Sequence, residues 1–284
     1  MLNSQAQLRQ TYLTQLALVV AADGRIDVDE LCKLYQAFAL LQTPANERQA
    51  LLHSLVFSLD ELADRQVPPV MLQQDELRLA LAKDAIFLER AGNPATRAAV
   101  DDLLRRLVVT PQQAHVMRDW VAMENRLIER LGAGQDELAD PSSVKELTAR
   151  AASVGVPVGA LYMAGITGFS AVGITSGLAA IGGLTGLTLL GLNPMTAGIA
   201  GLVMAGMTVK KVVDYAVGTG RAGETLEAKA RVAEMKRVSL AAATFAARDL
   251  PIFEVRGVEV DAERTELVAV NLRAARQELD RRAA

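Results

Sequence analysis

The segment from Ala151 to Val209 contains no Asp, Glu, Lys or Arg over 59 residues, and 13 of the chain's 21 glycines lie within it. A helix of roughly 20 apolar residues spans the hydrocarbon layer of a bilayer, so this segment is long enough to cross the layer twice. Small residues also let two helix backbones pack closely in lipid. The sequence therefore predicts a glycine-rich hydrophobic helical hairpin over residues 151–217, transmembrane or membrane-inserting.

Small residues recur at one-turn spacing along this hairpin, which places them on one face of a helix. We expect that face to pack against the other arm or against a second copy of the chain. The lipid bilayer and further copies of this chain are therefore its expected partners, besides other proteins. The positions predicted to carry this packing are Gly173, Gly177, Gly182, Gly186 and Gly201.

The hairpin turn has two candidate positions. A turn at Gly182-Gly183 gives arms of about 22 and 24 residues, which match the thickness of a bilayer. Asn193-Pro194 is the stronger helix breaker, and a turn there leaves a longer first arm. With that second turn the first arm is expected to break near Gly165 to Gly168, so that the two arms are not an unbroken pair of spans.

The charged flanks of the segment predict its orientation. Lys145 and Arg150 precede it and Lys210 and Lys211 follow it, and short cationic flanks stay on the cytoplasmic side. The N-terminus lacks the pattern of a secretory signal. We therefore expect an inner-membrane protein with both termini in the cytoplasm. The alternatives are a cytoplasmic protein that inserts only after a trigger, and permanent burial of the segment in a soluble bundle.

The polar parts on either side have different charge balances. Residues 1–150 carry 16 Lys and Arg against 21 Asp and Glu, and residues 210–284 carry 14 against 12. Neither part has the basic excess of a nucleic-acid-binding surface, so we expect no nucleic-acid partner. Cys32 is the only cysteine and lies in an apolar helical pattern, which predicts a buried thiol.

Residues 1–135 are predicted to form a helical domain. Apolar residues at helical spacing end at Gly24, and Asp27 with Glu30 forms the capping-box pattern of a second helix that runs through Leu41. Thr43-Pro44 starts a third helix, ending near Ala63. The same order then recurs, with helices over 74–90, 94–108 and 111–131. This predicts an all-α fold with a tandem three-helix repeat that shares one core.

Two further regions complete the predicted organisation. Residues 136–150 are a polar linker in which Ser142 or Ser143 caps a short helix. Residues 218–284 are a charged C-terminal helical region, beginning with a helix from Arg221 to about Arg248. The stretch from Pro251 to Val260 alternates apolar and polar residues, which predicts either a small β-hairpin or an extended linker. Asp261 is expected to cap a final helix, with an apolar face of Leu267, Val270 and Leu272.

The turn between the first two helices reads Ala21-Ala-Asp-Gly-Arg-Ile-Asp-Val-Asp-Glu30. With the apolar helix before it, this motif resembles the tellurite-resistance TerB-like family of helical domains, over about residues 5–131. The second unit keeps the frame but departs from the motif: aligned on the glycines, its equivalents of Asp23, Asp27 and Glu30 are Ala91, Ala95 and Ala98. The resemblance implies a cytoplasmic, membrane-proximal module of a stress or defence system.

The resemblance also implies that acidic residues bind a divalent metal, and only Asp23, Asp27 and Glu30 carry over. Three carboxylates around a tight turn offer the hard oxygen ligands that Ca²⁺ and Mg²⁺ prefer. In the alternative interpretation, Gly24 ends one helix while Asp27 and Glu30 cap the next, without metal.

A convergent set of catalytic groups is not recognisable in the sequence. His53 and His115 lie in helical patterns without metal-ligand spacing, and Trp120 lies at the helical spacing of a core residue. The sequence therefore predicts a non-enzymatic, membrane-anchored sensor or scaffold, possible cofactors being Ca²⁺ or Mg²⁺ alone. The alternative is a pore-forming effector whose hairpin oligomerises and permeabilises the membrane.

Overall fold

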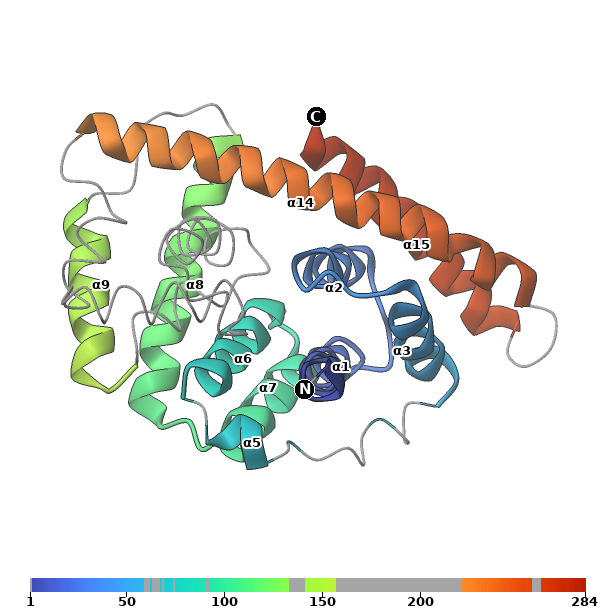
Figure 1. Ribbon diagram of the computed structural model, residues 1–284, viewed down its shortest axis with the longest axis horizontal. Coiled ribbons are helices and arrows are strands. Elements are labelled where there is room, and N and C mark those ends of the chain that lie inside the picture. The colour runs from blue at the N-terminus through green and yellow to red at the C-terminus, as the bar shows by residue number, and fades with distance from the viewer. Residues whose placement is uncertain are drawn as a thin grey trace.

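The computed structural model describes residues 2–58, 62, 67, 69–73, 75–89, 92–132, 141–156, 221–256 and 262–284, and the regular structure within these ranges is entirely helical. The all-α prediction is thereby confirmed (Figure 1). The helices are α1 (Leu2–Val20), α2 (Val28–Leu40), α3 (Ala45–Phe57), α5 (Pro69–Leu72), α6 (Asp75–Leu88), α7 (Pro94–Arg106), α8 (Pro111–Gly132), α9 (Pro141–Ser153), α14 (Arg221–Arg256) and α15 (Ala262–Ala283).

Local signals explain where the first helices begin and end. Gly24 and Gly92 have φ of +75° and +81°, a backbone conformation that glycine adopts without steric cost. Each glycine ends a turn before a capped helix: Asp27 caps α2, and Asn93 caps α7 by accepting from the backbone N–H groups of Ala95 and Thr96. The helix N-terminus therefore finds acceptors for its free N–H groups in both turns.

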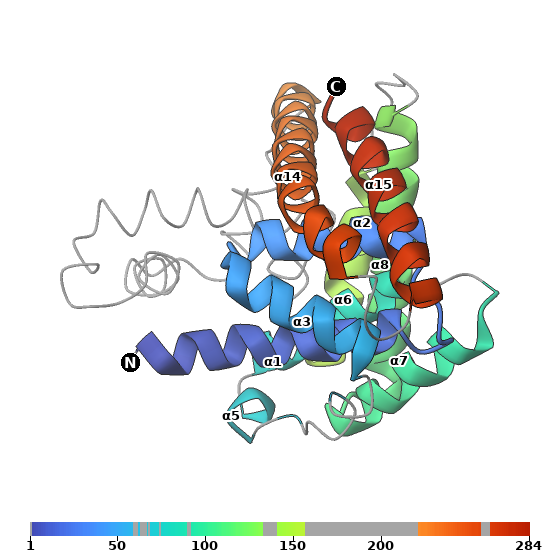
Figure 2. The ribbon, with the colours of Figure 1, turned by 90° about the vertical axis from the view of Figure 1, so that its right-hand side faces the viewer.

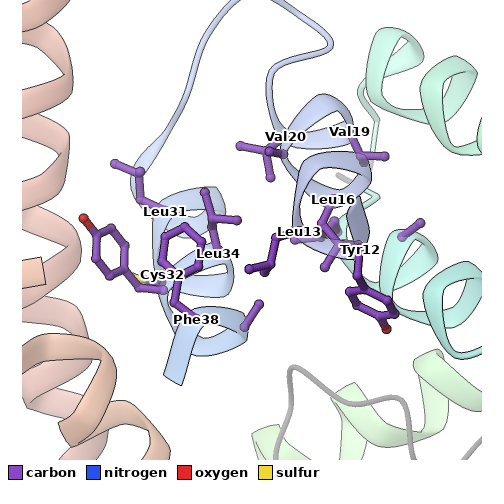
Figure 3. Close-up of a cluster of buried hydrophobic side chains, with 14 of the residues drawn as sticks. Tyr12, Leu13, Leu16, Val19, Val20, Leu31, Cys32, Leu34 and Phe38 are labelled. Carbon is purple, nitrogen blue, oxygen red and sulfur yellow. The ribbon is translucent and has the colours of Figure 1, made fainter. Parts of the chain in front are cut away.

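The interior between α1 and α2 is apolar (Figure 3). Both helices place large side chains three and four residues apart, so that one stripe of each faces the other. The labelled side chains that lie between them include Leu13, Leu16 and Val20 from α1 and Leu34 and Phe38 from α2. All of them are buried, and α6, α7 and α8 extend the same apolar cluster through residues that include Trp120.

The C-terminal helices belong to this body. α14 and α15 lie side by side and pack together against α2 and α3, as Figures 1 and 2 show from two directions. Buried residues of both helices, among them Ala246, Leu250 and Leu272, are part of the cluster that contains the α1–α2 interior. The charged C-terminal region predicted as a separate part therefore completes the N-terminal core.

The prediction for Pro251 to Val260 is wrong over the residues that the structure describes. α14 continues to Arg256 with Pro251 inside it, so residues 251–256 are neither strand nor extended linker. Pro251 is exposed, whereas Leu250 and Phe253 are buried. The free energy gained by burying these two side chains on one helical face outweighs the cost of the backbone hydrogen bond that the proline removes.

The predicted face of the last helix is correct only at Leu272. Leu267 and Val270 are 50% and 47% exposed, and the helix turns a different stripe to the core. That stripe consists of Thr265, Val268, Ala269, Leu272, Ala275 and Leu279, of which Thr265, Ala269 and Ala275 are small. Small side chains contribute little to an apolar pattern, which is why the largest residues misled the sequence-based assignment.

The predicted linker at residues 136–150 is helical from Pro141 onwards. α9 begins at Pro141, so Ser142 and Ser143 lie in its first turn rather than at its N-cap. The first residues of the uncharged segment belong to the folded body, because Ala151 and Val156 are buried and Gln113 of α8 donates to the Val154 carbonyl at 3.2 Å.

The rest of the predicted hairpin, residues 157–217, lies outside the described residues, together with its five candidate packing glycines. Among the helices that the structure describes, none combines the length and the apolar character that a membrane crossing requires.

Candidate functional site

The acidic turn places its three predicted metal ligands in hydrogen bonds of the chain itself. The Asp27 side chain accepts a hydrogen bond from the Glu30 backbone N–H at 2.9 Å. The Glu30 side chain accepts one from the Asp27 backbone N–H, also at 2.9 Å. Asp23 accepts from the Arg25 backbone N–H at 2.9 Å and from the Asn93 side-chain amide at 2.7 Å. The turn at Gly24 is thus bonded to the turn at Gly92.

This geometry confirms the capping interpretation of Asp27 and Glu30. Within the described part of the chain, no group of three or more His, Cys, Asp or Glu side chains is arranged to hold a metal ion. The three carboxylates do not converge as a ligand set here, and a response to Ca²⁺ or Mg²⁺ stays a prediction.

A buried ion pair joins the N-terminal helices to α14. The Arg48 guanidinium of α3 meets the Asp249 carboxylate of α14 through two bonds, Nε to Oδ2 at 2.9 Å and an Nη to Oδ1 at 3.1 Å. The two side chains are 3% and 0% exposed. Two parallel bonds of this kind fix the relative orientation of the groups as well as their distance.

The surroundings of the pair satisfy its remaining polar atoms. Arg48 also donates to the Thr43 carbonyl at 2.8 Å, and its guanidinium carbon lies 4.0 Å from the centroid of the Phe245 ring. The Tyr35 hydroxyl donates to Asp249 at 3.4 Å. Burial, and then the negative charge of Asp249, raise the pKa of Tyr35 well above its ordinary value, so this hydroxyl stays protonated and remains a donor.

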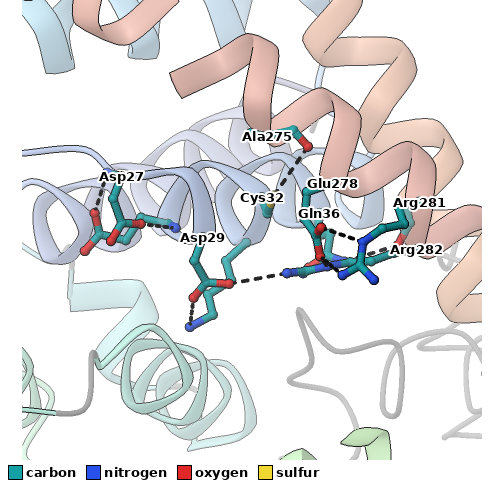
Figure 4. A network of polar contacts seen from close by, with 11 residues as sticks. Asp27, Asp29, Cys32, Gln36, Ala275, Glu278, Arg281 and Arg282 are labelled. Atoms are coloured by element: carbon teal, nitrogen blue, oxygen red, sulfur yellow. Dashed lines mark hydrogen bonds and ion pairs between the residues drawn. The ribbon is translucent and has the colours of Figure 1, made fainter. Parts of the chain in front are cut away.

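Further polar contacts hold the α14–α15 pair along α2. Gln36 donates to the Ser239 hydroxyl at 3.3 Å, and Asn271 donates to the Ile26 carbonyl at 2.8 Å. The Cys32 thiol donates to the Ala275 carbonyl at 3.4 Å (Figure 4). Burial raises the pKa of Cys32 to about 12, so the predicted buried thiol is confirmed and is almost entirely protonated at neutral pH.

A more exposed network lies at the edge of this contact (Figure 4). Glu278 bonds to both Arg281 and Arg282 of its own helix, and Arg282 reaches Asp29 of α2 at 3.5 Å. The hydrogen bond from Arg281, with further support from Arg282, lowers the pKa of Glu278 to about 2. Burial raises the pKa of Asp29, but Lys33 and Arg282 together outweigh it and lower that pKa.

We call the whole contact between the α14–α15 pair and α2–α3 the joint, and its buried polar groups include those of Arg48, Asp249, Tyr35, Gln36 and Ser239. The joint is the principal polar feature that sequence reasoning missed. A signal existed in α2, where Cys32, Tyr35 and Gln36 lie beside the apolar stripe and carry no charge. An uncharged second face indicates that another element covers it.

The remaining residues considered as site candidates have structural surroundings. His53 and His115 are exposed, and His115 lies 3.6 Å from Asp119 on the same helix. Trp120 is 2% exposed in the core of α8, which confirms its prediction as a core residue. No family model, no curated protein and no solved structure matches the chain.

Proposed function

We propose that the chain is a non-enzymatic, membrane-anchored sensor or scaffold: a folded helical body holds a glycine-rich segment that enters the bilayer as a hairpin. In this proposal the N-terminal helices are a TerB-like module with a tandem three-helix repeat. The equivalent turns at Gly24 and Gly92, bonded to each other through Asp23 and Asn93, support the repeat.

The observation that carries the proposal is the joint. The helices before the uncharged segment and those after it share one core and a buried ion pair. Both ends of the segment therefore belong to one folded body, which stays on one side of a membrane. Any crossing of the bilayer between them must be matched by a return, which favours a hairpin over a single span.

Topology mapping in intact cells tests this arrangement. Cysteines introduced as Ala98→Cys on α7 and Gln277→Cys on α15 replace exposed residues, while the native Cys32 is buried and serves as an unreactive background. Both new thiols are expected to resist a membrane-impermeant reagent and to react after permeabilisation. If either reacts in intact cells while the other does not, the two parts lie on opposite sides and the proposal is wrong.

Fractionation of the same cells tests the anchor. We expect the protein to remain with membranes through carbonate and high-salt washes. Quantitative recovery in the soluble fraction would exclude constitutive anchoring and leave conditional insertion. A membrane-potential dye separates the scaffold from the pore-forming alternative, because depolarisation that depends on residues 157–217 is expected only of a pore.

A divalent-cation response is a further proposal for Asp23, Asp27 and Glu30. A rise in melting temperature with Ca²⁺ or Mg²⁺ that Asp23→Ala abolishes, and that His53→Ala leaves intact, supports metal binding at the acidic turn. A melting temperature indifferent to both ions leaves capping as the role of these residues.

A further inference from the structure

Two helices of the N-terminal body, α2 and α7, end in the same kind of backbone turn. Gln42 follows the end of α2 and Val108 follows the end of α7, with φ of +48° and +54°. In both turns the N–H of the next residue bonds to the carbonyl five positions before it, at 2.9 Å. Glycine or asparagine commonly occupies this position at a helix end, because other side chains meet steric resistance in the left-handed conformation.

The residue at this position differs between the two turns. Gln42 is polar and exposed, which suits a turn in water. Val108 is β-branched, a class of side chain that this backbone conformation strongly disfavours, and it is 70% exposed. A single exposed valine is ordinary on a protein surface, but here the exposure coincides with backbone strain. Neither burial nor backbone preference accounts for a valine in this turn, which indicates a contact made outside the folded body.

The turn at Val108 lies beside the point where the uncharged segment leaves the body. The Gln113 side chain of α8 accepts from the Thr110 backbone N–H at 3.1 Å and donates to the Val154 carbonyl at 3.2 Å. It thereby joins the α7–α8 turn to the end of α9, and Figure 1 shows the two at the same corner of the body. Val156 is buried, so the body holds the first residues of the segment in place at this corner.

The length of the uncharged segment brings this corner close to the bilayer in the proposed anchor. Residues 157–209 carry no charge, and two crossings of roughly 20 residues each take up most of them. The remainder has to supply the hairpin turn and the approaches to the membrane. The first crossing therefore begins a short distance along the chain from Val156, and the surface beside Val156 lies near the lipid headgroups.

The end of α7 also carries a charge that suits a layer of headgroups. Arg105 and Arg106 lie in its last turn, and one carboxylate, that of Asp102, pairs with both at 3.0 Å. These three side chains together keep one excess positive charge beside Val108. Membrane-surface elements combine apolar side chains with Arg or Lys in this way, because the apolar group enters the boundary of headgroups and acyl chains while the cation meets anionic lipid.

We propose that the α7–α8 turn is a membrane contact of the folded body: Val108 enters the interfacial layer of the bilayer beside the start of the hairpin, and Arg105 meets anionic headgroups. The contact rests on the proposed anchor and adds to it a fixed orientation of the body on the membrane. The valine is retained in a strained turn because the bilayer, rather than the core, covers its side chain.

An environment-sensitive label at the turn tests the contact in the full-length chain. Val108→Cys carries a nitrobenzoxadiazole group, and Gln42→Cys carries the same group at the comparable turn before α3, which lies across the body from α9 (Figure 1). The native Cys32 is buried and stays unlabelled in both proteins. Each protein is reconstituted in vesicles of phosphatidylethanolamine and phosphatidylglycerol, with or without a lipid that carries a nitroxide near its headgroup.

We expect the nitroxide lipid to quench the label at position 108 about twofold or more compared with the label at position 42. Equal quenching at the two positions, in protein that remains with the vesicles, overturns the contact and leaves the anchor standing. A label at position 108 that is shielded from water but not quenched by the lipid means that protein, such as a second copy, covers the turn, and also overturns the contact. Protein that does not remain with the vesicles overturns anchor and contact together.

The backbone strain is tested separately in detergent, where no bilayer covers the turn. Val108→Gly removes the side chain from the left-handed conformation and is expected to raise the melting temperature by about 2–4 °C. Gln42→Gly supplies the comparison, and a smaller rise is expected there because glutamine is not β-branched. A melting temperature that Val108→Gly leaves unchanged or lowers means that the valine costs nothing in this turn. That result removes the reason for an outside contact and overturns the inference.

Discussion

Helices α2 and α7 hold equivalent positions in the two predicted three-helix units and have the same length of 13 residues, yet they are buried differently. α7 buries a single stripe, Thr96, Val100, Leu103 and Leu104, and turns charged residues outward. α2 buries eight residues, which cover two faces: Glu30, Leu31, Cys32, Leu34, Tyr35, Gln36, Ala37 and Phe38. The outer face of α7 is therefore exposed to solvent, whereas the outer face of α2 is covered by the C-terminal helices.

The difference shows that a local pattern specifies an inner face but not the element that covers an outer one. On α7, Asp101 and Asp102 stand at exposed positions and mark the surface directly. On α2, Cys32 and Gln36 occupy outer positions and are neutral, so they suit either a surface or a contact. Only the fold identifies α14 and α15 as the cover.

The largest expected change in the free energy of unfolding distinguishes the outer face of α2 from that of α7. Tyr35→Ala removes a fully buried ring and the hydroxyl that donates to Asp249, and is expected to lower the free energy of unfolding by about 3–5 kcal/mol. Asp102→Ala on the outer face of α7 removes only exposed ion pairs and is expected to change it by less than about 1 kcal/mol. Urea unfolding followed by far-UV circular dichroism measures both, and equal losses would erase the contrast.

The inner faces are expected to behave alike. Leu34 of α2 and Leu103 of α7 are both fully buried, and replacing either with Ala leaves a cavity that costs about 2–5 kcal/mol. Thermal unfolding is expected to give similar decreases in melting temperature for the two variants. A decrease confined to one of them would mean that the two units do not share the core equally.

Much of this framework was predictable from the sequence. Apolar periodicity and the signals at Gly24 and Gly92 place most helices of residues 1–132 to within a few residues, but α3 ends at Phe57 rather than near Ala63, and α5 was not predicted. The acidic motif predicts its capping box, because capping depends on neighbours three residues apart. The joint was not predictable, since Arg48 and Asp249 are 201 residues apart and each alone resembles a solvated helix charge.

The caps of α2 and α7 should contribute a smaller, similar amount. Asp27→Ala and Asn93→Ala each remove a side-chain acceptor from a helix N-terminus, which costs about 0.5–2 kcal/mol. Differential scanning calorimetry without added metal checks the pair. A loss at Asn93 well beyond that at Asp27 would show that its bond to Asp23 matters more than its cap.

The smallest effect is electrostatic and belongs to the edge of the joint. Glu278 has a folded-state pKa of about 2, below its ordinary 4.5. Its contribution to stability is therefore fully present above pH 4.5 and is lost as the pH falls towards 2. Because the side chain is partly exposed, we expect less than about 1 kcal/mol. The urea midpoint at pH 6 minus that at pH 3 should be slightly smaller in Glu278→Gln, and an unchanged difference would remove Glu278 from the acid response.

Placement of the core-completing helices at the far end of the chain has a consequence for biosynthesis. When α9 leaves the ribosome, α14 and α15 have not been made and the outer face of α2 is still exposed. Roughly 100 further residues separate α9 from α15. At about 5–20 residues per second, that interval lasts about 5–20 s. The glycine-rich segment is made within this interval, so it leaves the ribosome before α14 and α15 can cover the outer face of α2.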